Sequence, residues 1–157
     1  QDLMRNQFYK QRSDFELSAI ERDKTQVMPE GVSVQTDIPY MNDGDKAHRM
    51  DVYRPEGSES TTLPVVINIH GGGLLIGSKE FNRFFCAKLS RLGYLVFSIE
   101  YRLVPDCMVF DQFSDVCNAF KYINAHLGEY NGDSNHIYGV ADSGGAYLLT
   151  YTAAMAK

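Results

Sequence analysis

Two glycine-rich stretches of this sequence have the residue types and the spacing for nucleophilic attack on a carbonyl group. In the first, a short apolar run over residues 63–69 opens into His-Gly-Gly-Gly at residues 70–73. Three successive glycines after a buried strand are costly in chain entropy, so they usually mark a close approach of the backbone to another group. Because no Cβ stands in the way, their N–H groups can point into one shared space, which suits an oxyanion. Read alone, the triplet is also compatible with a plain turn.

The second stretch places a serine on a tight strand-to-helix turn. The strand-like run 136–140 is followed by Ala-Asp-Ser-Gly-Gly at 141–145 and then by an alanine-rich segment typical of a helix. Small neighbours allow the strained backbone of such a nucleophile elbow, which holds the serine hydroxyl out for attack. The N–H of Gly144 then lies at a helix N-terminus, where unpaired donors and the helix dipole favour negative charge. The consensus Gly-x-Ser-x-Gly begins with glycine, and this chain has Ala141, the smallest replacement, in that place.

Three motifs together resemble those of the hormone-sensitive-lipase-like branch of the α/β-hydrolases. Members of that branch carry His-Gly-Gly-Gly-x-x-x-Gly-Ser, which residues 70–78 match in full. They also carry Tyr-Arg-Leu-Ala-Pro-Glu and Gly-Asp-Ser-Ala-Gly-Gly, to which residues 101–106 and 141–146 are similar. The order of the motifs agrees as well, and the resemblance covers about residues 32–157. It implies an α/β-hydrolase fold and the hydrolysis of carboxylic esters with small or short-chain acyl groups, through an acyl-enzyme.

The resemblance also implies a role for each motif residue. Ser143 is the expected nucleophile, and the N–H groups of Gly72, Gly73 and Gly144 are the expected oxyanion hole for the tetrahedral intermediate. Three further residues are expected to support the two loops and not to react themselves: His70, Gly71 and Asp142. The loop after the fourth strand is expected to be pinned by a third set: Tyr101, Arg102 and Asp106.

The sequence lacks the acid and the base that a serine nucleophile needs. In α/β-hydrolases they follow the nucleophile, in the order Ser, then Asp or Glu, then His. The fourteen residues after Ser143 contain no His, Asp or Glu, and a domain of this class usually needs about 100 more residues. We therefore expect this chain to be the N-terminal half of a hydrolase and to be inactive alone. Of the remaining histidines, none has a motif around it, and all are expected at the surface or in loops: His48, His126 and His136.

Two alternative functions stay open at this point. A catalytically inactive relative would bind a small ligand in the same cleft, with Ser143 and the glycines retained. Amidases and deacylases share the fold, and the residues that select the leaving group lie mostly downstream of this sequence.

The remaining sequence predicts the elements that position these residues. Residues 1–30 form an N-terminal segment with one or two irregular amphipathic helices, which either helps to cover the site or packs outside it. Residues 31–157 form the N-terminal half of the hydrolase domain. The pattern of apolar residues and turns predicts one hairpin, three buried strands and two helices. The hairpin covers 32–40 and 49–53, and the strands cover 63–69, 94–99 and 136–140. A helix capped by Ser78 follows the first of these strands, and a helix over 111–127 follows the second.

Strands that alternate with helices predict an α/β fold with a mostly parallel sheet, an N-terminal antiparallel hairpin and flanking helices. In such a fold, residues 70–73 and Ser143 meet at the carboxyl ends of neighbouring strands. The strand 137–140 is expected to lie inside the complete sheet. Its far edge would then pair with the missing C-terminal half of the domain or with another chain.

Composition narrows the range of partners. At 157 residues and 44% apolar content, the chain is one globular unit or part of one, and a net charge of −5 offers no footing for nucleic acid. No apolar run reaches the ~18 residues of a membrane span. The expected substrate is a small-molecule ester, with no metal ion or other cofactor. Three scattered cysteines indicate reduced thiols and a cytoplasmic location: Cys86, Cys107 and Cys117.

Overall fold

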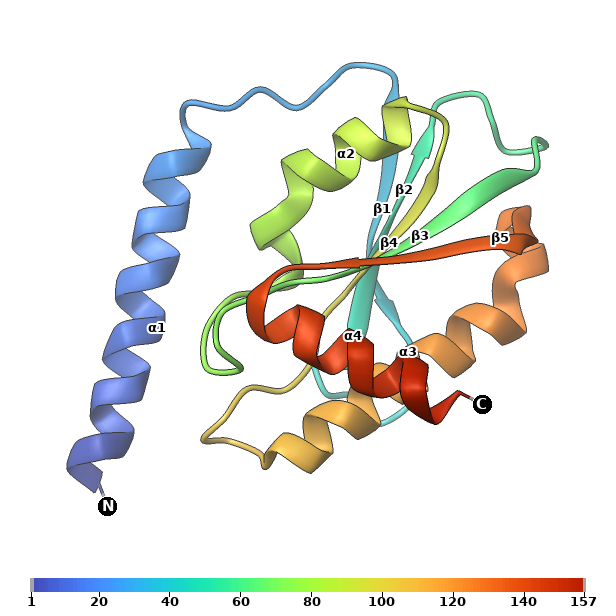
Figure 1. The fold of residues 1–157 in the computed structure, drawn as a ribbon. Coiled ribbons are helices and arrows are strands. Elements are labelled where there is room, and N and C mark those ends of the chain that lie inside the picture. The colour runs from blue at the N-terminus through green and yellow to red at the C-terminus, as the bar shows by residue number, and fades with distance from the viewer. Residues whose placement is uncertain (1, 157) are drawn as a thin grey trace.

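A computed structural model describes residues 2–156 of the chain as a five-stranded sheet with helices on both faces and one long helix beside it (Figure 1). The strands, in sequence order, are these: β1 (Val32–Pro39), β2 (Arg49–Pro55), β3 (Leu63–Ile69), β4 (Leu95–Ile99) and β5 (Gly132–Ala141). The helices, two of them short 3₁₀ turns, are these: α1 (Asp2–Asp23), η1 (Lys79–Asn82), α2 (Arg83–Arg91), α3 (Val109–His126), η2 (Leu127–Tyr130) and α4 (Ser143–Met155). Gln1 and Lys157, the outer ends of the two expected segments, lie outside the described residues.

The strands are arranged in the order β1-β2-β4-β3-β5, with β3 between two parallel neighbours. The predicted hairpin is confirmed, because β1 pairs antiparallel with β2, and β2 pairs antiparallel with β4. The sheet is therefore mixed, with a parallel half that holds the motifs. In that half Ile69 is level with both Ile99 and Ala141, so that three loops leave the sheet at the same height.

Alternation along the central strands separates two apolar layers. Val65, Ile67 and Ile69 face α3 and α4 in the larger core cluster, whereas Val66 faces α2 in the smaller one. All four side chains are buried. Because successive side chains of a strand point to opposite faces, the β-branched run of β3 presents apolar residues to both layers and lies at the centre of the sheet.

Helix α1 is continuous, but its apolar residues are divided between an exposed side and an inward side. Leu3, Met4 and Ile20, which suggested an amphipathic helix, are exposed. The residues on the inward side follow one another at helical spacing and are only half-buried, and two of them are arginines: Phe8, Arg12, Phe15, Ala19 and Arg22. The helix has no buried residue. Contacts other than core packing must hold it in place.

Two predicted boundaries need correction. Strand β5 begins at Gly132, four residues earlier than the apolar run 136–140 indicated. Ser78 precedes a 3₁₀ turn before α2, and its side chain makes no capping hydrogen bond there. Both errors arise where exposed or irregular backbone leaves no apolar pattern in the sequence.

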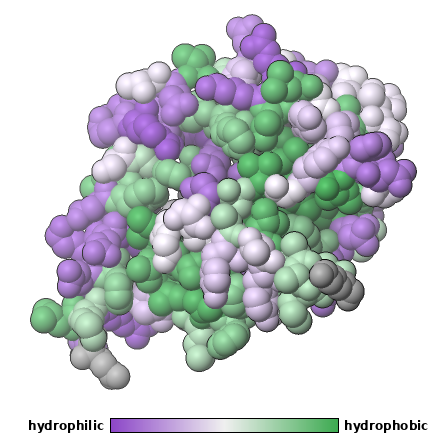
Figure 2. All heavy atoms as spheres, viewed as in Figure 1, coloured by the Kyte–Doolittle hydropathy of each residue, from purple (hydrophilic) through white to green (hydrophobic). Residues whose placement is uncertain are grey.

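Strand β5 forms one edge of the sheet within the described residues. Its central residues are exposed, with Ile137 at 38% and Tyr138 at 49%. Figure 2 shows hydrophobic side chains at the surface of this face, over β5 and α4. Among residues 2–156, no helix is long and apolar enough to cross a membrane.

Candidate active site

Ser143 lies at the junction of β5 and α4, as the motif predicted. The strand ends at Ala141, Asp142 is extended, and Ser143 begins the helix with φ at +46°. A positive φ is uncommon outside glycine and costs strain that the surrounding structure must offset. The Ser143 residue is exposed. This geometry is that of a nucleophile elbow.

The turn at Ser143 packs directly on the loop that follows β3. A Cβ on Gly145 would collide with the carbonyl oxygens of Ile69 and His70, and one on Gly71 would collide with Asp142. Both positions therefore require glycine, because Gly145 lies against backbone carbonyls and Gly71 against the side chain and carbonyl of Asp142. The structure thus brings together the two glycine-rich stretches, although more than 60 residues separate them in the sequence.

Backbone nitrogens of the glycine loop lie beside the start of α4. A Cβ on Gly144 would lie 3.2 Å from the nitrogen of Gly73 and 3.0 Å from that of Leu74. Within residues 2–156, the N–H groups of Gly72, Gly73 and Leu74 donate to no protein acceptor. Unpaired donors at this place can stabilise negative charge on a bound group.

The orientation of the Gly73 N–H follows from the Gly72 carbonyl on the other side of the same peptide. The oxygen of Gly72 accepts hydrogen bonds from Leu75 (3.1 Å) and Ile76 (3.0 Å). Since C=O and N–H point in opposite directions across a trans peptide, these bonds turn the Gly73 N–H away from the turn. Gly72 itself has φ at +126°, which only glycine adopts readily.

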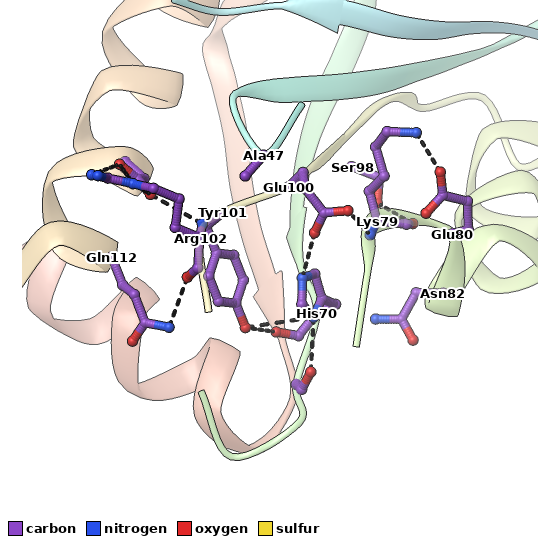
Figure 3. A network of polar contacts seen from close by, with 12 residues as sticks. Ala47, His70, Lys79, Glu80, Asn82, Ser98, Glu100, Tyr101, Arg102 and Gln112 are labelled. Carbon is purple, nitrogen blue, oxygen red and sulfur yellow. Dashed lines mark hydrogen bonds and ion pairs between the residues drawn. The ribbon is translucent and has the colours of Figure 1, made fainter. Parts of the chain in front are cut away.

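His70 supports the glycine loop and is not placed as a base. Its ring is buried, with Nδ1 at 2.8 Å from the Gly71 oxygen and Nε2 at 2.9 Å from a Glu100 carboxylate oxygen. The ring stacks on Tyr101 with centroids 4.4 Å apart, and the Tyr101 hydroxyl donates to the His70 oxygen at 2.7 Å (Figure 3). With both ring nitrogens engaged, His70 holds the Gly71 carbonyl and thereby orients the Gly72 N–H.

Asp142 links the two loops through its carboxylate. Its Oδ1 accepts hydrogen bonds from the Gly71 N–H at 3.1 Å and from Asn82 Nδ2 at 3.2 Å. Neither Asn82 nor Glu100 was among the expected site residues. Glu100 was recoverable from the sequence, because parallel strands that are level at Ile69 and Ile99 place their next residues side by side.

His48 lies in a loop, as one of the two predicted alternatives had it, but it is buried and not at the surface. The loop that carries it folds back on α3 and buries the ring between two carboxylates, at 2.6 Å from Asp43 and 3.0 Å from Asp115. The Asp45 backbone N–H and the His48 ring both donate to Asp43 and hold its pKa below the usual range. His136 is exposed and His126 half-buried, as expected of residues without a motif.

The loop after β4 is tied down on two sides. Arg102 donates to both carboxylate oxygens of Asp115 on α3, at 2.9 and 2.7 Å. Asp106, in contrast, does not pin the loop to the sheet: it accepts hydrogen bonds from Tyr9 and Arg12 of helix α1. The expected pinning residues therefore divide between the body of the fold and the N-terminal helix.

The cysteine thiols lie away from this chemistry. All three are free, and burial raises the pKa of Cys86 to about 12 and that of Cys107 to about 11. Among the described residues, no group of three or more His, Cys, Asp or Glu side chains is arranged to hold a metal ion. A cavity of about 310 Å³ lies between α1 and residues 77–83, and neither Ser143 nor Gly73 lines it.

The fold and the loop geometry define an α/β-hydrolase of the hormone-sensitive-lipase-like kind. The BD-FAE family model matches residues 50–157, and the chain belongs to that family. Two curated relatives are each 31% identical: the probable carboxylic ester hydrolase LipM of Mycobacterium tuberculosis over 123 residues, and the probable isoprenylcysteine alpha-carbonyl methylesterase ICMEL1 of Arabidopsis thaliana over 105 residues. These matches cover 73% and 67% of this chain, but 28% and 22% of the relatives.

Solved esterases have the same fold over nearly the whole chain. Esterase B from Lactobacillus rhamnosis, in a structure with a tributyrin phosphonate, is 27% identical, with a TM-score of 0.92 over 98% of this chain. A hyperthermophilic esterase from Pyrobaculum calidifontis is 30% identical, with a TM-score of 0.79 over 95%. The chain spans 50% and 46% of these two structures.

Proposed function

We propose that this chain carries the nucleophile and the oxyanion-binding loop of a serine hydrolase that cleaves carboxylic esters. The proposal depends above all on one observation, the N–H groups of Gly73 and Leu74 packed against Gly144, immediately after the strained Ser143. Esterases among the relatives and the similar structures support the same reaction class.

The reaction proceeds in two halves. Ser143 Oγ forms a bond to the acyl carbon, its proton passes to a histidine base, and the carbonyl electron pair becomes an oxyanion held by the N–H groups of Gly72, Gly73 and Gly144. The oxyanion collapses and the alcohol leaves with the proton, so that an acyl-enzyme remains on Ser143. Water then attacks the same carbon, gives its proton to the base and releases the acid. Small or short-chain acyl groups are the proposed substrates.

The base and its acid come from outside the 157 residues. Each histidine of this chain has a ring nitrogen within hydrogen-bond distance of a nearby carboxylate or carbonyl oxygen, and no His, Asp or Glu follows Ser143. The exposed edge of β5 is where the C-terminal half of the domain, or another chain, would add its strands. We further propose that residues 1–30 act as a cap segment beside residues 31–157, and that the protein works in the cytoplasm.

Labelling with a fluorophosphonate probe tests the nucleophile in the full-length protein. Labelling that Ser143→Ala abolishes and the exposed control Ser134→Ala leaves intact supports the proposal. No labelling of the wild-type protein under any condition indicates a binding module that has lost catalysis.

The isolated 157-residue chain gives a second test. We expect no turnover of p-nitrophenyl acetate, because the base is absent, and we expect self-association through the β5 edge in size-exclusion chromatography. A monomer with Ser143-dependent turnover would show that a histidine within these residues acts as the base.

A further inference from the structure

Arg12 of helix α1 makes three hydrogen bonds to the segments that follow the glycines and β4. Its Nε donates to the Leu75 oxygen at 2.7 Å, its Nη2 to the Val104 oxygen at 2.6 Å and its Nη1 to Asp106 at 2.6 Å. The side chain is 16% exposed. A guanidinium can serve three acceptors in fixed directions, which an ammonium group on a flexible stem does not do.

Gln112 of helix α3 binds the neighbouring carbonyl of the same turn. Its Nε2 donates to the Arg102 oxygen at 2.8 Å (Figure 3) and to the Leu74 oxygen at 2.9 Å. The Gln112 side chain is fully buried. Two side chains from different helices thus fix two consecutive carbonyl groups, those of Leu74 and Leu75.

Each of these carbonyls shares a peptide plane with an N–H that holds Gly72. The Leu74 oxygen lies opposite the Leu75 N–H, and the Leu75 oxygen lies opposite the Ile76 N–H. Both N–H groups donate to the Gly72 oxygen. That oxygen in turn lies opposite the Gly73 N–H, which faces Gly144. Arg12 and Gln112 are therefore linked to the proposed oxyanion hole through three peptide groups: those of residues 74–75 and 75–76, and, through their hydrogen bonds, that of residues 72–73.

We propose that Arg12 and Gln112 are positioning residues for the oxyanion hole, and that the hydrogen bonds of Arg12, as distinct from the general anchoring of α1, set the direction of the Gly73 N–H. This inference rests on the proposed function. It assigns to α1 an effect on the transition state, because a displaced donor stabilises the oxyanion less even when the substrate still binds.

Arg22 provides a matched control on the same helix. It donates to the Phe81 oxygen at 2.9 Å and pairs with Asp23, so it also anchors α1 to the body of the fold. It makes no hydrogen bond to residues 72–76. Replacing Arg22 weakens the anchoring of α1 without touching the peptide series.

The experiment compares Arg12→Ala, Arg12→Lys, Gln112→Leu and Arg22→Ala in the full-length protein. We measure kcat and KM for p-nitrophenyl butyrate and the second-order rate of Ser143 labelling by a fluorophosphonate. Arg12→Ala and Gln112→Leu should lower kcat and the labelling rate about tenfold or more with KM within about twofold, since small misplacements near a reacting centre are costly. Arg12→Lys should recover part of the loss, and Arg22→Ala should stay within about twofold of the wild type.

Amide hydrogen exchange gives a readout that does not require activity. Arg12→Ala should speed exchange at Leu75 and Ile76, whereas the Gly71 N–H, which Asp142 holds, should keep its protection. Equal effects of Arg12→Ala and Arg22→Ala on the labelling rate, or a change in KM alone, would overturn the positioning role while leaving the serine hydrolase intact. A wild-type protein that is not labelled at Ser143 would overturn both proposals. If Arg12→Ala does not fold, the labelling rates of Arg12→Lys and Arg22→Ala are compared. A larger loss in Arg12→Lys supports the positioning role, and equal losses overturn it.

Discussion

The glycine loop is held on two sides, by α4 and by α1, in opposite ways. On the α4 side backbone meets backbone, and a single methyl group at Gly145 or Gly71 has no room. On the α1 side the helix buries no residue and is held by side-chain hydrogen bonds from Arg12, Arg22 and Tyr9. A collision in a closely packed region disturbs all the atoms around it, whereas separate polar contacts near the surface can be removed one at a time. Damage on the α4 side should therefore appear as lost stability, and damage on the α1 side as smaller, graded effects.

Gly145→Ala tests the α4 side most severely. The new Cβ would collide with the carbonyl oxygens of Ile69 and His70, neither of which can move without disturbing β3. Overpacking of this kind typically costs about 3 kcal/mol, and we expect thermal melting to fall by about 6–12 °C. Gly144→Ala is the milder comparison, because its Cβ would lie 3.0–3.3 Å from backbone atoms of Gly73 and Leu74, which need to shift only slightly. Equal melting temperatures for both variants would show that close packing at Gly145 does not hold the α4 side together.

A second pair of variants separates two neighbouring glycines of the loop. Gly72 has φ at +126° and its Cβ would collide with the Ile76 oxygen, whereas Gly73 has φ at +59° and open space around its Cβ. Gly72→Ala should therefore disrupt the turn and reduce kcat/KM about a hundredfold, as the loss of an oxyanion donor does. Gly73→Ala should cost only about 1 kcal/mol of backbone strain, while the β-branched Gly73→Val should cripple turnover and leave the fold nearly intact. Esterase kinetics on the full-length protein measure all three.

The strands and the motif loops were predictable because the signals for them are local. The apolar run of β3, the three glycines and the serine turn each occupy a few consecutive residues. The start of β5 was not predictable, since Gly132 pairs with Leu63 but the polar residues 133–135 fall in the irregularity before Val65 pairs with Ile137. An exposed edge strand lacks the buried face that creates the alternating pattern.

The supporting residues depend on contacts between distant segments. Arg12 and Asp106 are 94 positions apart, and a lone arginine on a helix carries no sign of the carbonyl that it will bind. The same limit explains why the burial of His48 was not predicted, since its surroundings are set by a loop that folds onto α3. Glu100 differs, since its place beside His70 follows from the register of two parallel strands.

Tyr101→Phe should have an intermediate effect. The variant removes the hydroxyl that donates to the His70 oxygen at 2.7 Å and leaves a buried carbonyl without that partner. We expect a loss of about 1–2 kcal/mol in the free energy of unfolding, with the ring stacking on His70 retained. Chemical denaturation measures it, and Tyr94→Phe, outside this network, serves as the control. A variant as stable as the wild type would mean that another donor reaches the His70 oxygen.

The smallest expected effect is a pH dependence at the contact between α1 and the loop after β4. The Tyr9 hydroxyl, and after it Arg12, donate to Asp106 and hold its pKa below the ordinary value of 3.8. A lowered pKa in the folded state gives stability that is present above pH 3.8 and is lost as the pH falls through the lower folded-state value. Because the Asp106 side chain is 44% exposed, the contribution should be only about 0.5 kcal/mol.

Asp106→Asn should accordingly lower the melting temperature by about 1–2 °C at pH 7, and this difference from the wild type should shrink as the pH falls below 3.8. Tyr9→Phe removes the leading cause of the lowered pKa, so Asp106→Asn should cost less in that background than in the wild type. The double-mutant cycle isolates this coupling from any general loosening of α1. A difference that stays constant across the whole pH range would show that Asp106 contributes through its shape and not through its charge.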